Sequence, residues 1–470
     1  MKKKLFLLKS IIGFSVASWI SAGLNFFILP ISTRVFLPED LAKINLFYSV
    51  VTILMTVSCM GIDQGYMRFY HEKEDVERGG LLTWCIRSSA IWLSIILILS
   101  LPFRRYVGQW LYGEEQNFVV FHLYICALCL VIYRYISILY RMENRIVGYT
   151  IVAIISSAVI KFSYLLAAIF GGNYVLAIRI MSLMSGVVTI LIAIIQKEIL
   201  KTNIPAKSIM TKEFFKFSIP LFPIGFMVQL NNYLPQFIIR NSGDFNNLGV
   251  FSSAVTLAGI VTLIQSGINI FWSPYVLKKY KNPKNDIKEM QNLLSATVIS
   301  FALLIMMFGD VIVRLLGDDY QKAIVYLPFL LLIPICYTLA EVTGIGIIIS
   351  KKSYLNIKIY FFTICMNLLL ASMFIRIWGA VGVAVASGLS ATFMLLVKTV
   401  TAQKYYTNIE NKKRFYIDIF LLLVACFLNT ILYKNMVFKI VVNLGILVLI
   451  ILPTCKMWIR KICVQTDEER

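Results

Sequence analysis

Residues 149–195 read YTIVAIISSAVIKFSYLLAAIFGGNYVLAIRIMSLMSGVVTILIAII, two apolar runs of about twenty residues on either side of the turn FGGN. A run of that length crosses a hydrocarbon core of about 30 Å as an α-helix. An open sheet is excluded, because lipid would leave its edge hydrogen-bonding groups unpaired. The alternation typical of a membrane β-barrel is also absent from these runs. This stretch therefore predicts two consecutive transmembrane helices.

The rest of the chain repeats this pattern. Of its 470 residues, 59% are hydrophobic, whereas about 45–50% is usual in soluble proteins. We predict an all-α, polytopic membrane protein with about fourteen transmembrane helices, the first of them an uncleaved span rather than a signal peptide. The expected spans are residues 10–31, 41–62, 81–103, 119–140, 149–170, 175–195, 215–238, 248–271, 291–313, 323–345, 358–375, 380–400, 416–433 and 438–457.

The formal net charge is +21, and the Lys and Arg residues are unevenly distributed. With a cytoplasmic N-terminus, the inside segments carry about three times as many Lys and Arg as the outside ones, as the positive-inside rule requires. We therefore expect both termini in the cytoplasm and an even number of spans. Cations that face anionic lipid on the cytoplasmic side explain the charge without a nucleic-acid partner.

Two faint repeats suggest an internal duplication. LFYSVVTIL (46–54) resembles VFSSAVTLA (250–258), and the pair Ser185-Gly186 recurs as Ser387-Gly388, each about 200 residues later. We predict two six-helix bundles related by pseudo-two-fold symmetry, followed by two additional helices. The expected parts are residues 1–200 for the first bundle, 201–214 for a cytoplasmic linker, 215–405 for the second bundle, 416–457 for the additional helices and 458–470 for a cytoplasmic tail.

Four cations lie at least one turn inside the predicted spans of the first bundle, where each charge near the bilayer centre costs about 2.5–3.5 kcal/mol. Ser, Thr or Tyr residues share their helical faces, and no acid lies within these four spans. We predict a water-lined cavity that accepts an anion, most plausibly phosphate. In the alternative reading, each side chain snorkels to the interface or caps a carbonyl group. The candidate substrate-binding residues are Arg87, Arg134, Lys161 and Arg179.

The second bundle carries polar rather than cationic candidates. Gln229, Asn232 and Gln236 follow helical spacing in a span that three prolines interrupt. Glu341 lies in span 323–345, close to Pro334 and two glycines. We expect Glu341 to be a proton or Na⁺ site and the amides to contact a glycan. Polar packing between helices is the alternative for the amides.

The stretch from Gly61 to Glu77 is dense in charge at the predicted cytoplasmic end of the second span. Asp63 and Arg68 are candidates for a gate or a substrate-access contact, together with Arg141 at the same end of the fourth span. A solvated loop is the alternative. The nine cysteines and two histidines form no metal-ligand cluster, so we expect no metal site.

Two stretches resemble a known family. They are LNFFILPISTRVFLPEDLAKINLFYSVVTILMTVSCMGIDQGYMRFYHE (24–72) and GVFSSAVTLAGIVTLIQSGINIFWSPYV (249–276). Both are similar to Wzx-type polysaccharide flippases of the multidrug/oligosaccharidyl-lipid/polysaccharide exporter superfamily. The shared features of the first stretch are the turn LPED, then a span that ends in Gly-Ile-Asp and Arg-Phe-Tyr. One departure is Leu234-Pro235-Gln236, where relatives often carry an acid–arginine pair.

The resemblance implies a non-enzymatic flippase for an undecaprenyl-diphosphate-linked oligosaccharide, which works by alternating access in the bacterial cytoplasmic membrane. The surface polysaccharide would be O-antigen, capsule or exopolysaccharide. By location, the diphosphate site maps onto the four cations of the first bundle. The implied partners are membrane lipids, a polysaccharide polymerase and chain-length machinery. No cofactor is expected beyond coupling to H⁺ or Na⁺.

The residues leave two alternative functions open. A multidrug exporter of the same superfamily is expected to prefer acids in its cavity, whereas a lipid II flippase shares the diphosphate. A membrane polysaccharide polymerase or ligase is expected to place its catalytic groups on a long external loop. The external segments here are short, and the longest runs from Arg104 to Phe118. We find no catalytic constellation or nucleophile elbow.

Overall fold

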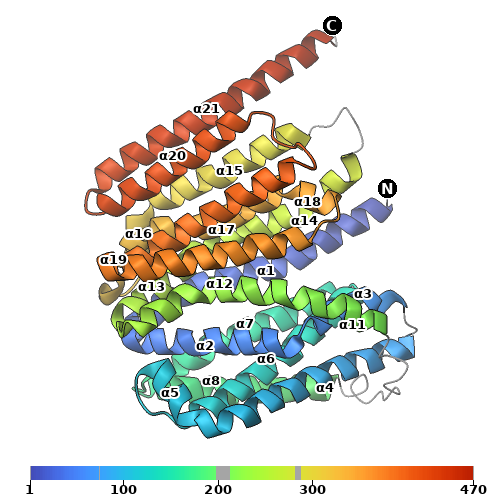
Figure 1. Ribbon diagram of the computed structural model, residues 1–470, viewed down its shortest axis with the longest axis vertical. Coiled ribbons are helices and arrows are strands. Elements are labelled where there is room, and N and C mark those ends of the chain that lie inside the picture. Colours follow the sequence, from blue (N-terminus) through green and yellow to red (C-terminus); the bar gives the residue numbers. More distant parts are fainter. Residues whose placement is uncertain (1, 73–74, 197–211, 281–286, 469–470) are drawn as a thin grey trace. The chain divides into compact units, whose positions relative to one another are not determined.

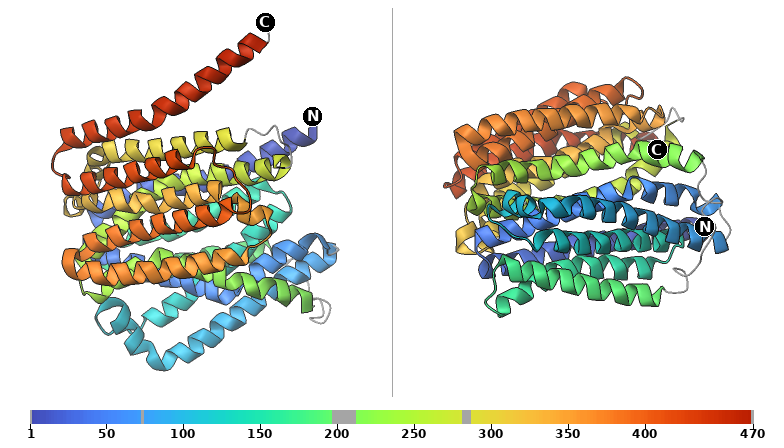
Figure 2. Two further views of the ribbon diagram at one scale, coloured as in Figure 1. Left: turned by 45° about the horizontal axis from the view of Figure 1, so that its top comes forward. Right: turned by 60° about the horizontal axis from the view of Figure 1, so that its bottom comes forward.

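The computed structural model describes residues 2–72, 75–196, 212–280 and 287–468, which form helices joined by short turns (Figure 1). No strand occurs in these residues. The predicted all-α membrane fold is therefore confirmed. Residue contacts divide the chain into two compact units, Met1–Ser252 and Ser253–Arg470. Within each unit the long helices run roughly parallel or antiparallel to one another (Figure 2).

The first unit begins with the long helix α1 and ends within α13. Its helices and short 3₁₀ turns are α1 (Lys2–Val35), α2 (Pro38–Cys59), α3 (Ile62–Phe69), η1 (Tyr70–Glu72), α4 (Asp75–Ser100), η2 (Leu101–Phe103), α5 (Arg104–Tyr112), α6 (Val119–Met142), α7 (Ile146–Ile169), α8 (Tyr174–Ile195), α11 (Lys212–Ser218), η3 (Ile219–Leu221), α12 (Phe222–Asn241) and α13 (Phe245–Ala258).

The second unit contains the remaining helices, including two at the C-terminal end. They are η4 (Gly259–Val261), α14 (Thr262–Lys279), α15 (Ile287–Met307), α16 (Gly309–Arg314), η5 (Asp318–Tyr320), α17 (Ala323–Thr343), α18 (Ile345–Ile349), α19 (Tyr354–Gln403), α20 (Lys412–Ile431) and α21 (Met436–Glu468). Helix α21 continues through most of the predicted tail.

Eleven helical segments of the described residues are long and apolar enough to cross a membrane. One of them is α19, whose 50 residues would extend about 75 Å if straight. Gly379 breaks this helix with φ 59° and ψ −141°, between the predicted spans 358–375 and 380–400. Helices α1 and α12, at two further predicted spans, are not among the eleven. The count of fourteen stays a prediction.

A tight turn between α2 and α3 shapes the predicted cytoplasmic end of the first unit. Met60 ends α2 with φ 45°, and Gly61 follows with φ 77°. A Cβ atom on Gly61 would lie 2.2 Å from the carbonyl oxygen of Ser218. Only glycine therefore meets both the left-handed backbone and the close approach of the segment after α11. The turn directs α3 across this end of α2.

The core beneath this turn joins α2, α3, α4, α6 and α11. Its buried side chains are Cys59, Ile62, Tyr66, Tyr70, Leu81, Leu82, Cys85, Val131, Tyr135, Ile138, Leu139 and Phe214. The aromatic rings provide much of the buried apolar area, which is the main source of stability for such a cluster. This packing fixes α3 and α6 relative to each other inside the first unit.

A contact between a cysteine and a hydroxyl group occurs in each of the two units. Cys126 lies 3.3 Å from the hydroxyl of Ser182, between α6 and α8. Cys336 lies 3.7 Å from the hydroxyl of Thr392, between α17 and α19. Both pairs are 56 residues apart in sequence. The predicted domain limits stay a prediction, and most of the predicted linker, residues 201–211, lies outside the described residues.

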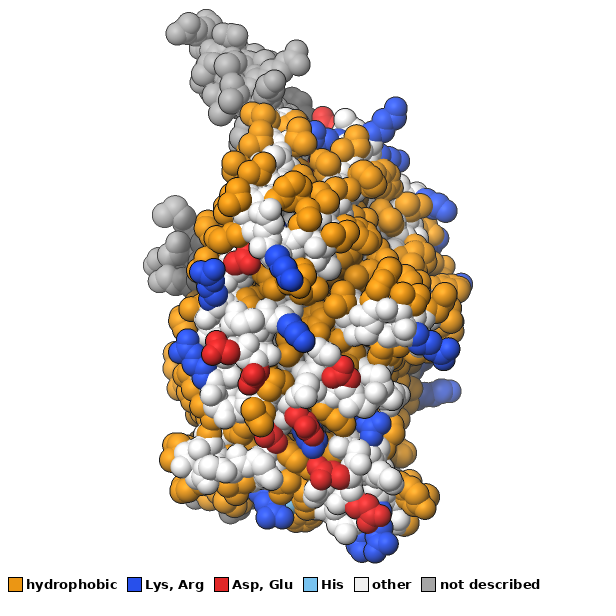
Figure 3. Space-filling model, turned by 90° about the vertical axis from the view of Figure 1, so that its left-hand side faces the viewer, with side chains coloured by type: hydrophobic (Ala, Val, Ile, Leu, Met, Phe, Trp, Pro, Cys, Tyr) orange, Lys and Arg blue, Asp and Glu red, His pale blue; other side chains and the backbone are white. Residues whose placement is uncertain are grey.

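Acidic and basic side chains lie together at the predicted outer end (Figure 3). The turn before α6 and helix α5 lie at this end, which faces the viewer in Figure 3. Asp and Glu side chains stand there beside Lys and Arg among apolar ones. The orientation of the chain in the membrane stays a prediction.

Candidate functional site

A cavity of about 430 Å³ lies at the predicted cytoplasmic end of the first unit. Helices α2, α3, α6 and α12 form its walls, so all of it belongs to one unit. Apolar side chains dominate the wall from α12, and the polar groups come mainly from α3 and α6. The lining residues are Met55, Thr56, Cys59, Gly61, Asp63, Gln64, Arg134, Leu221, Phe222, Ile224, Gly225, Val228 and Gln229.

The charged feature of this cavity is an ion pair between α6 and α3. Nε and Nη2 of Arg134 donate to Oδ2 of Asp63 at 3.1 and 2.8 Å. The Arg134 side chain is 43% exposed, whereas that of Asp63 is 11% exposed. Within the described residues, Nη1 of Arg134 donates to no protein group. The guanidinium is therefore oriented by Asp63 and still presents N–H groups to the cavity.

The sequence of α6 explains why Arg134 faces the cavity. Val131 and Tyr135, on either side of it, are buried in the core of the unit. The hydroxyl of Tyr135 also lies 2.9 Å from that of Ser89 on α4. These contacts fix the rotation of α6 about its axis, so residue 134 points away from the core. Position 134 thus holds a cation on a rigid element.

The pairing corrects one expectation from the sequence. No acid lies within the predicted spans that carry the cations, and we expected the cations to have no acidic neighbour. Asp63 lies just beyond the end of α2, and the turn at Met60 and Gly61 brings it to Arg134. The signal was present in the motif Gly-Ile-Asp, but the sequence does not show which helix the aspartate contacts.

The amide residues of α12 occupy three different positions. Gln229 lines the cavity beside the Asp63–Arg134 pair. Oε1 of Gln236 accepts a hydrogen bond of 2.9 Å from Ser49 on α2, in a buried position. Asn232 is exposed. The geometry favours a substrate contact for Gln229 and helix packing for Gln236.

The other three predicted cations lie elsewhere in the first unit. Lys161 of α7 lies 5.5 Å from the ring centroid of Tyr48 on α2. Arg179 of α8 lies 5.4 Å from the ring centroid of Phe118, near the predicted outer end. Arg87 is exposed on α4. Among the described residues, the lining of the Arg134 cavity includes none of these three. Their role in substrate binding stays a prediction.

The candidate gate residues are also separated. Arg68 pairs with Glu72 at 2.5 Å, one turn further along the chain, and not with Asp63. Its side chain is 56% exposed. Arg141 is exposed near the end of α6. Both lie at the same end of the unit as the cavity, so a role in substrate access stays a prediction.

The second unit contains an ion pair that sequence reasoning missed. Nζ of Lys398 on α19 lies 2.7 Å from Oε1 of Glu341 on α17. Lys398 is 7% exposed and Glu341 is 35% exposed. The sequence analysis named Glu341 but not its partner, and the role of Glu341 as a proton or Na⁺ site stays a prediction. The signal in the sequence is Lys398 itself, which lies close to the end of the apolar span 380–400.

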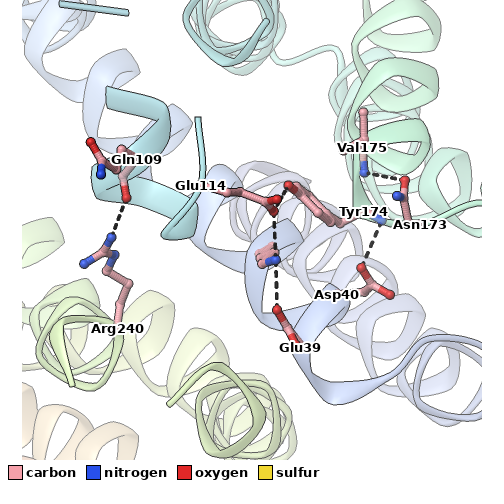
Figure 4. Close-up of polar contacts among 9 residues, drawn as sticks. Glu39, Asp40, Gln109, Glu114, Asn173, Tyr174, Val175 and Arg240 are labelled. Atoms are coloured by element: carbon pink, nitrogen blue, oxygen red, sulfur yellow. Dashed lines mark hydrogen bonds and ion pairs between the residues drawn. The ribbon is translucent and has the colours of Figure 1, made fainter. Parts of the chain in front are cut away.

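A second polar cluster lies at the predicted outer end of the first unit (Figure 4). Lys43 of α2 pairs with Glu39 at 2.9 Å and with Glu114 at 3.0 Å. The hydroxyl of Tyr174 donates to Glu114. This hydrogen bond and the Lys43 ammonium lower the pKa of the Glu114 carboxyl, against an opposing effect of burial. The cluster thus joins α2, α8 and the turn before α6.

Helix α12 is attached to the same end by a cation. Nη2 of Arg240 donates to the carbonyl oxygen of Gln109 on α5 at 2.7 Å (Figure 4). Its guanidinium carbon lies 5.9 Å from the ring centroid of Trp110. The hydrogen bond between Ser49 and Gln236 joins α12 to α2. Together with the bond from Arg240 to α5, it fixes α12 within the first unit.

The fold is that of transporters of the MOP superfamily. One similar structure is the lipid II flippase MurJ in an inward closed conformation, with 15% identity, a TM-score of 0.65, and coverage of 96% of this chain and 100% of that chain. Another is an outward-facing multidrug resistance MATE family transporter, with 15% identity, a TM-score of 0.57, and coverage of 86% and 97%. A third is a MOP superfamily transporter from Pyrococcus furiosus Vc1 (DSM3638), with 15% identity, a TM-score of 0.56, and coverage of 85% and 95%.

Residues 7–278 match the family described as polysaccharide biosynthesis protein, which is more than half of the chain. The chain belongs to this family. Comparison with curated proteins gives no match. The fold that the resemblance implied and the link to polysaccharide biosynthesis are therefore confirmed, and the narrower Wzx-type assignment stays a prediction.

Proposed function

We propose that the protein is a flippase that moves an undecaprenyl-diphosphate-linked oligosaccharide from the inner to the outer leaflet of the bacterial cytoplasmic membrane. The observation that carries this proposal is the cavity around Arg134 in a member of the polysaccharide biosynthesis family. A guanidinium with N–H groups directed into a confined space suits a diphosphate, because Arg binds phosphate oxygens in a planar fork.

Asp63 has two functions in this mechanism. It orients the guanidinium before substrate arrives, which reduces the entropy lost on binding. It also competes with the diphosphate for the same donors, so the substrate can leave after translocation. Gln64 donates to the same carboxylate oxygen at 3.0 Å and so helps to hold the carboxylate in place.

The nature of the cavity agrees with a lipid-linked substrate. Polar groups of α3 and α6 would bind the diphosphate, and Gln229 would contact the first sugar. The lipid chain would stay in the bilayer. We propose that the protein works by alternating access without catalysis, coupled to H⁺ or Na⁺, beside a polymerase and chain-length machinery. The glycan of lipid II carries the same diphosphate, so lipid II is the alternative substrate.

Translocation by purified protein tests the proposal. Proteoliposomes would receive a fluorescent undecaprenyl-diphosphate sugar, with lipid II in a parallel arm, and quenching would report the leaflet of the label. R134Q should reduce the rate of flipping at least tenfold. The matched control is R145Q, which removes an arginine that pairs with Glu143 at 2.9 Å outside the cavity. Equal rates in wild type and R134Q would contradict the cavity assignment.

A further inference from the structure

A cavity of about 780 Å³ with many polar lining residues lies in the second unit. It lies between α15, α20 and α21, at the predicted cytoplasmic end of these helices. Nothing in the proposed transport cycle uses it, because the Arg134 cavity belongs to the first unit. The lining residues are Asn292, Ser295, Ala296, Glu410, Asn411, Lys412, Lys413, Arg414, Phe415, Asp418 and Pro453.

The acids that line this cavity already have partners. Glu410 accepts a hydrogen bond of 3.3 Å from Asn292 on α15. Asp418 forms an ion pair with Nε of Arg414 at 2.9 Å, one turn away on α20. Nη2 of Arg414 donates to the carbonyl oxygen of Leu449 on α21. These contacts hold α15, α20 and α21 together around the cavity.

The two lysines of the lining have no such partner. Lys412 and Lys413 are exposed, and neither makes an ion pair or hydrogen bond with any residue that the structure describes. Arg414 balances the charge of Asp418, whereas Glu410 keeps its charge because Asn292 is neutral. The lining thus carries three cations against two carboxylates, and this excess leaves a positive potential in the cavity. A group with negative charge and several oxygen acceptors is the chemical complement of this site.

The surroundings indicate a lipid rather than a soluble anion. Exposed apolar side chains continue from the cavity along α20 and α21, including Ile417, Phe420 and Leu452. These positions face the hydrocarbon region once the helices span the membrane. A phosphate group at Lys412 and Lys413 would therefore place attached acyl chains along this apolar surface.

We propose that this cavity binds the headgroup of an anionic phospholipid of the cytoplasmic leaflet. The phosphate lies between the ammonium groups of Lys412 and Lys413, and the headgroup hydroxyls contact Asn292 and Ser295. The bound lipid fills the space between α15 and the two C-terminal helices. The site differs from general attraction of cations to the membrane surface, because it has a defined volume and polar walls.

Native mass spectrometry of the full chain tests this inference. The protein would be released from nanodiscs of phosphatidylcholine with a minor fraction of phosphatidylglycerol, and the retained lipids would be counted. Wild type should retain one phosphatidylglycerol in preference to phosphatidylcholine. K412Q/K413Q should weaken that binding by roughly 30-fold, because each cation near anionic lipid contributes about 1 kcal/mol.

Two controls separate a built site from diffuse attraction. K351Q/K352Q removes two adjacent lysines outside this cavity and should leave retention of phosphatidylglycerol unchanged. A296L fills the cavity without a change of charge and should abolish the retained lipid. Equal loss in K351Q/K352Q, or full retention in A296L, would overturn the proposal.

Glycerol phosphate added to delipidated protein should not bind measurably. Binding as tight as that of the lipid would overturn the lipid assignment.

Discussion

Asp63 holds the guanidinium of Arg134 through a single carboxylate oxygen, with contacts of 3.1 and 2.8 Å. The two residues come from different helices and are 71 positions apart in sequence. The aspartate is nearly buried, whereas the arginine reaches the cavity. This arrangement leaves the cation both fixed and available, which is what a phosphate site requires.

A double-mutant cycle on this pair should show coupled effects. R134Q leaves Asp63 buried without its cation, so it should lower the stability by about 1–3 kcal/mol, the usual cost of an unpaired buried polar or charged group. D63N should retain substrate binding but release substrate more slowly, because the competing carboxylate is gone. R134Q/D63N should recover stability but not transport. Thermal unfolding measures the effect on stability, and initial flipping rates measure the effect on transport. If the stability changes of the two single variants simply add in the double variant, the pair is not coupled.

The close approach at Gly61 should make this position far more sensitive than a similar glycine elsewhere. Gly61 and Gly243 have nearly the same backbone, with φ 77° and 79°. A Cβ atom would lie 2.2 Å from Ser218 at position 61, whereas position 243 has nothing within 4 Å. G61A should therefore lower the free energy of unfolding by about 1–3 kcal/mol more than G243A does, because overpacking usually costs that much. The melting temperatures of the two variants provide the comparison, and equal values would contradict the packing argument.

The two partners of the second ion pair should respond differently to neutralisation. Lys398 is 7% exposed and Glu341 is 35% exposed. E341Q leaves a buried ammonium group without a counter-charge, whereas K398M leaves a carboxylate that water reaches. E341Q should therefore be the more destabilising change, by up to about 3–5 kcal/mol, and E341Q/K398M should recover most of the loss. Chemical unfolding in detergent measures the loss of stability in each variant. A larger loss in K398M than in E341Q would contradict this prediction.

The outer cluster should produce a dependence of stability on pH. The Tyr174 hydroxyl and Lys43 hold the pKa of the Glu114 carboxyl below its unfolded value of about 4.3. A carboxyl with a lowered folded pKa stabilises the protein above the unfolded pKa, and this stabilisation is lost as the pH falls through the folded pKa. Y174F should lower the melting temperature at pH 7, and the difference from wild type should shrink below about pH 4. Y106F, at a residue that is 71% exposed, is the control.

The membrane fold could be predicted from the sequence because apolar runs of fixed length have few solutions in lipid. The break at Gly379 also falls between the predicted spans 358–375 and 380–400. Contacts between helices could not be predicted. The pairing of Asp63 with Arg134 depends on two left-handed residues after α2, and Lys398 lies too close to a helix end to be recognised as buried. Helix rotation and register, which decide such contacts, have only weak signals in one sequence.

The central claim is that Arg134 receives the diphosphate of the substrate. The most direct test is the affinity of undecaprenyl diphosphate for the purified protein, measured by native mass spectrometry or microscale thermophoresis. R134Q should bind at least about tenfold more weakly than wild type, since a charged hydrogen bond contributes about 1.5–3 kcal/mol, and R145Q should bind as wild type does. If R134Q binds undecaprenyl diphosphate with wild-type affinity while remaining folded, Arg134 is not the diphosphate site.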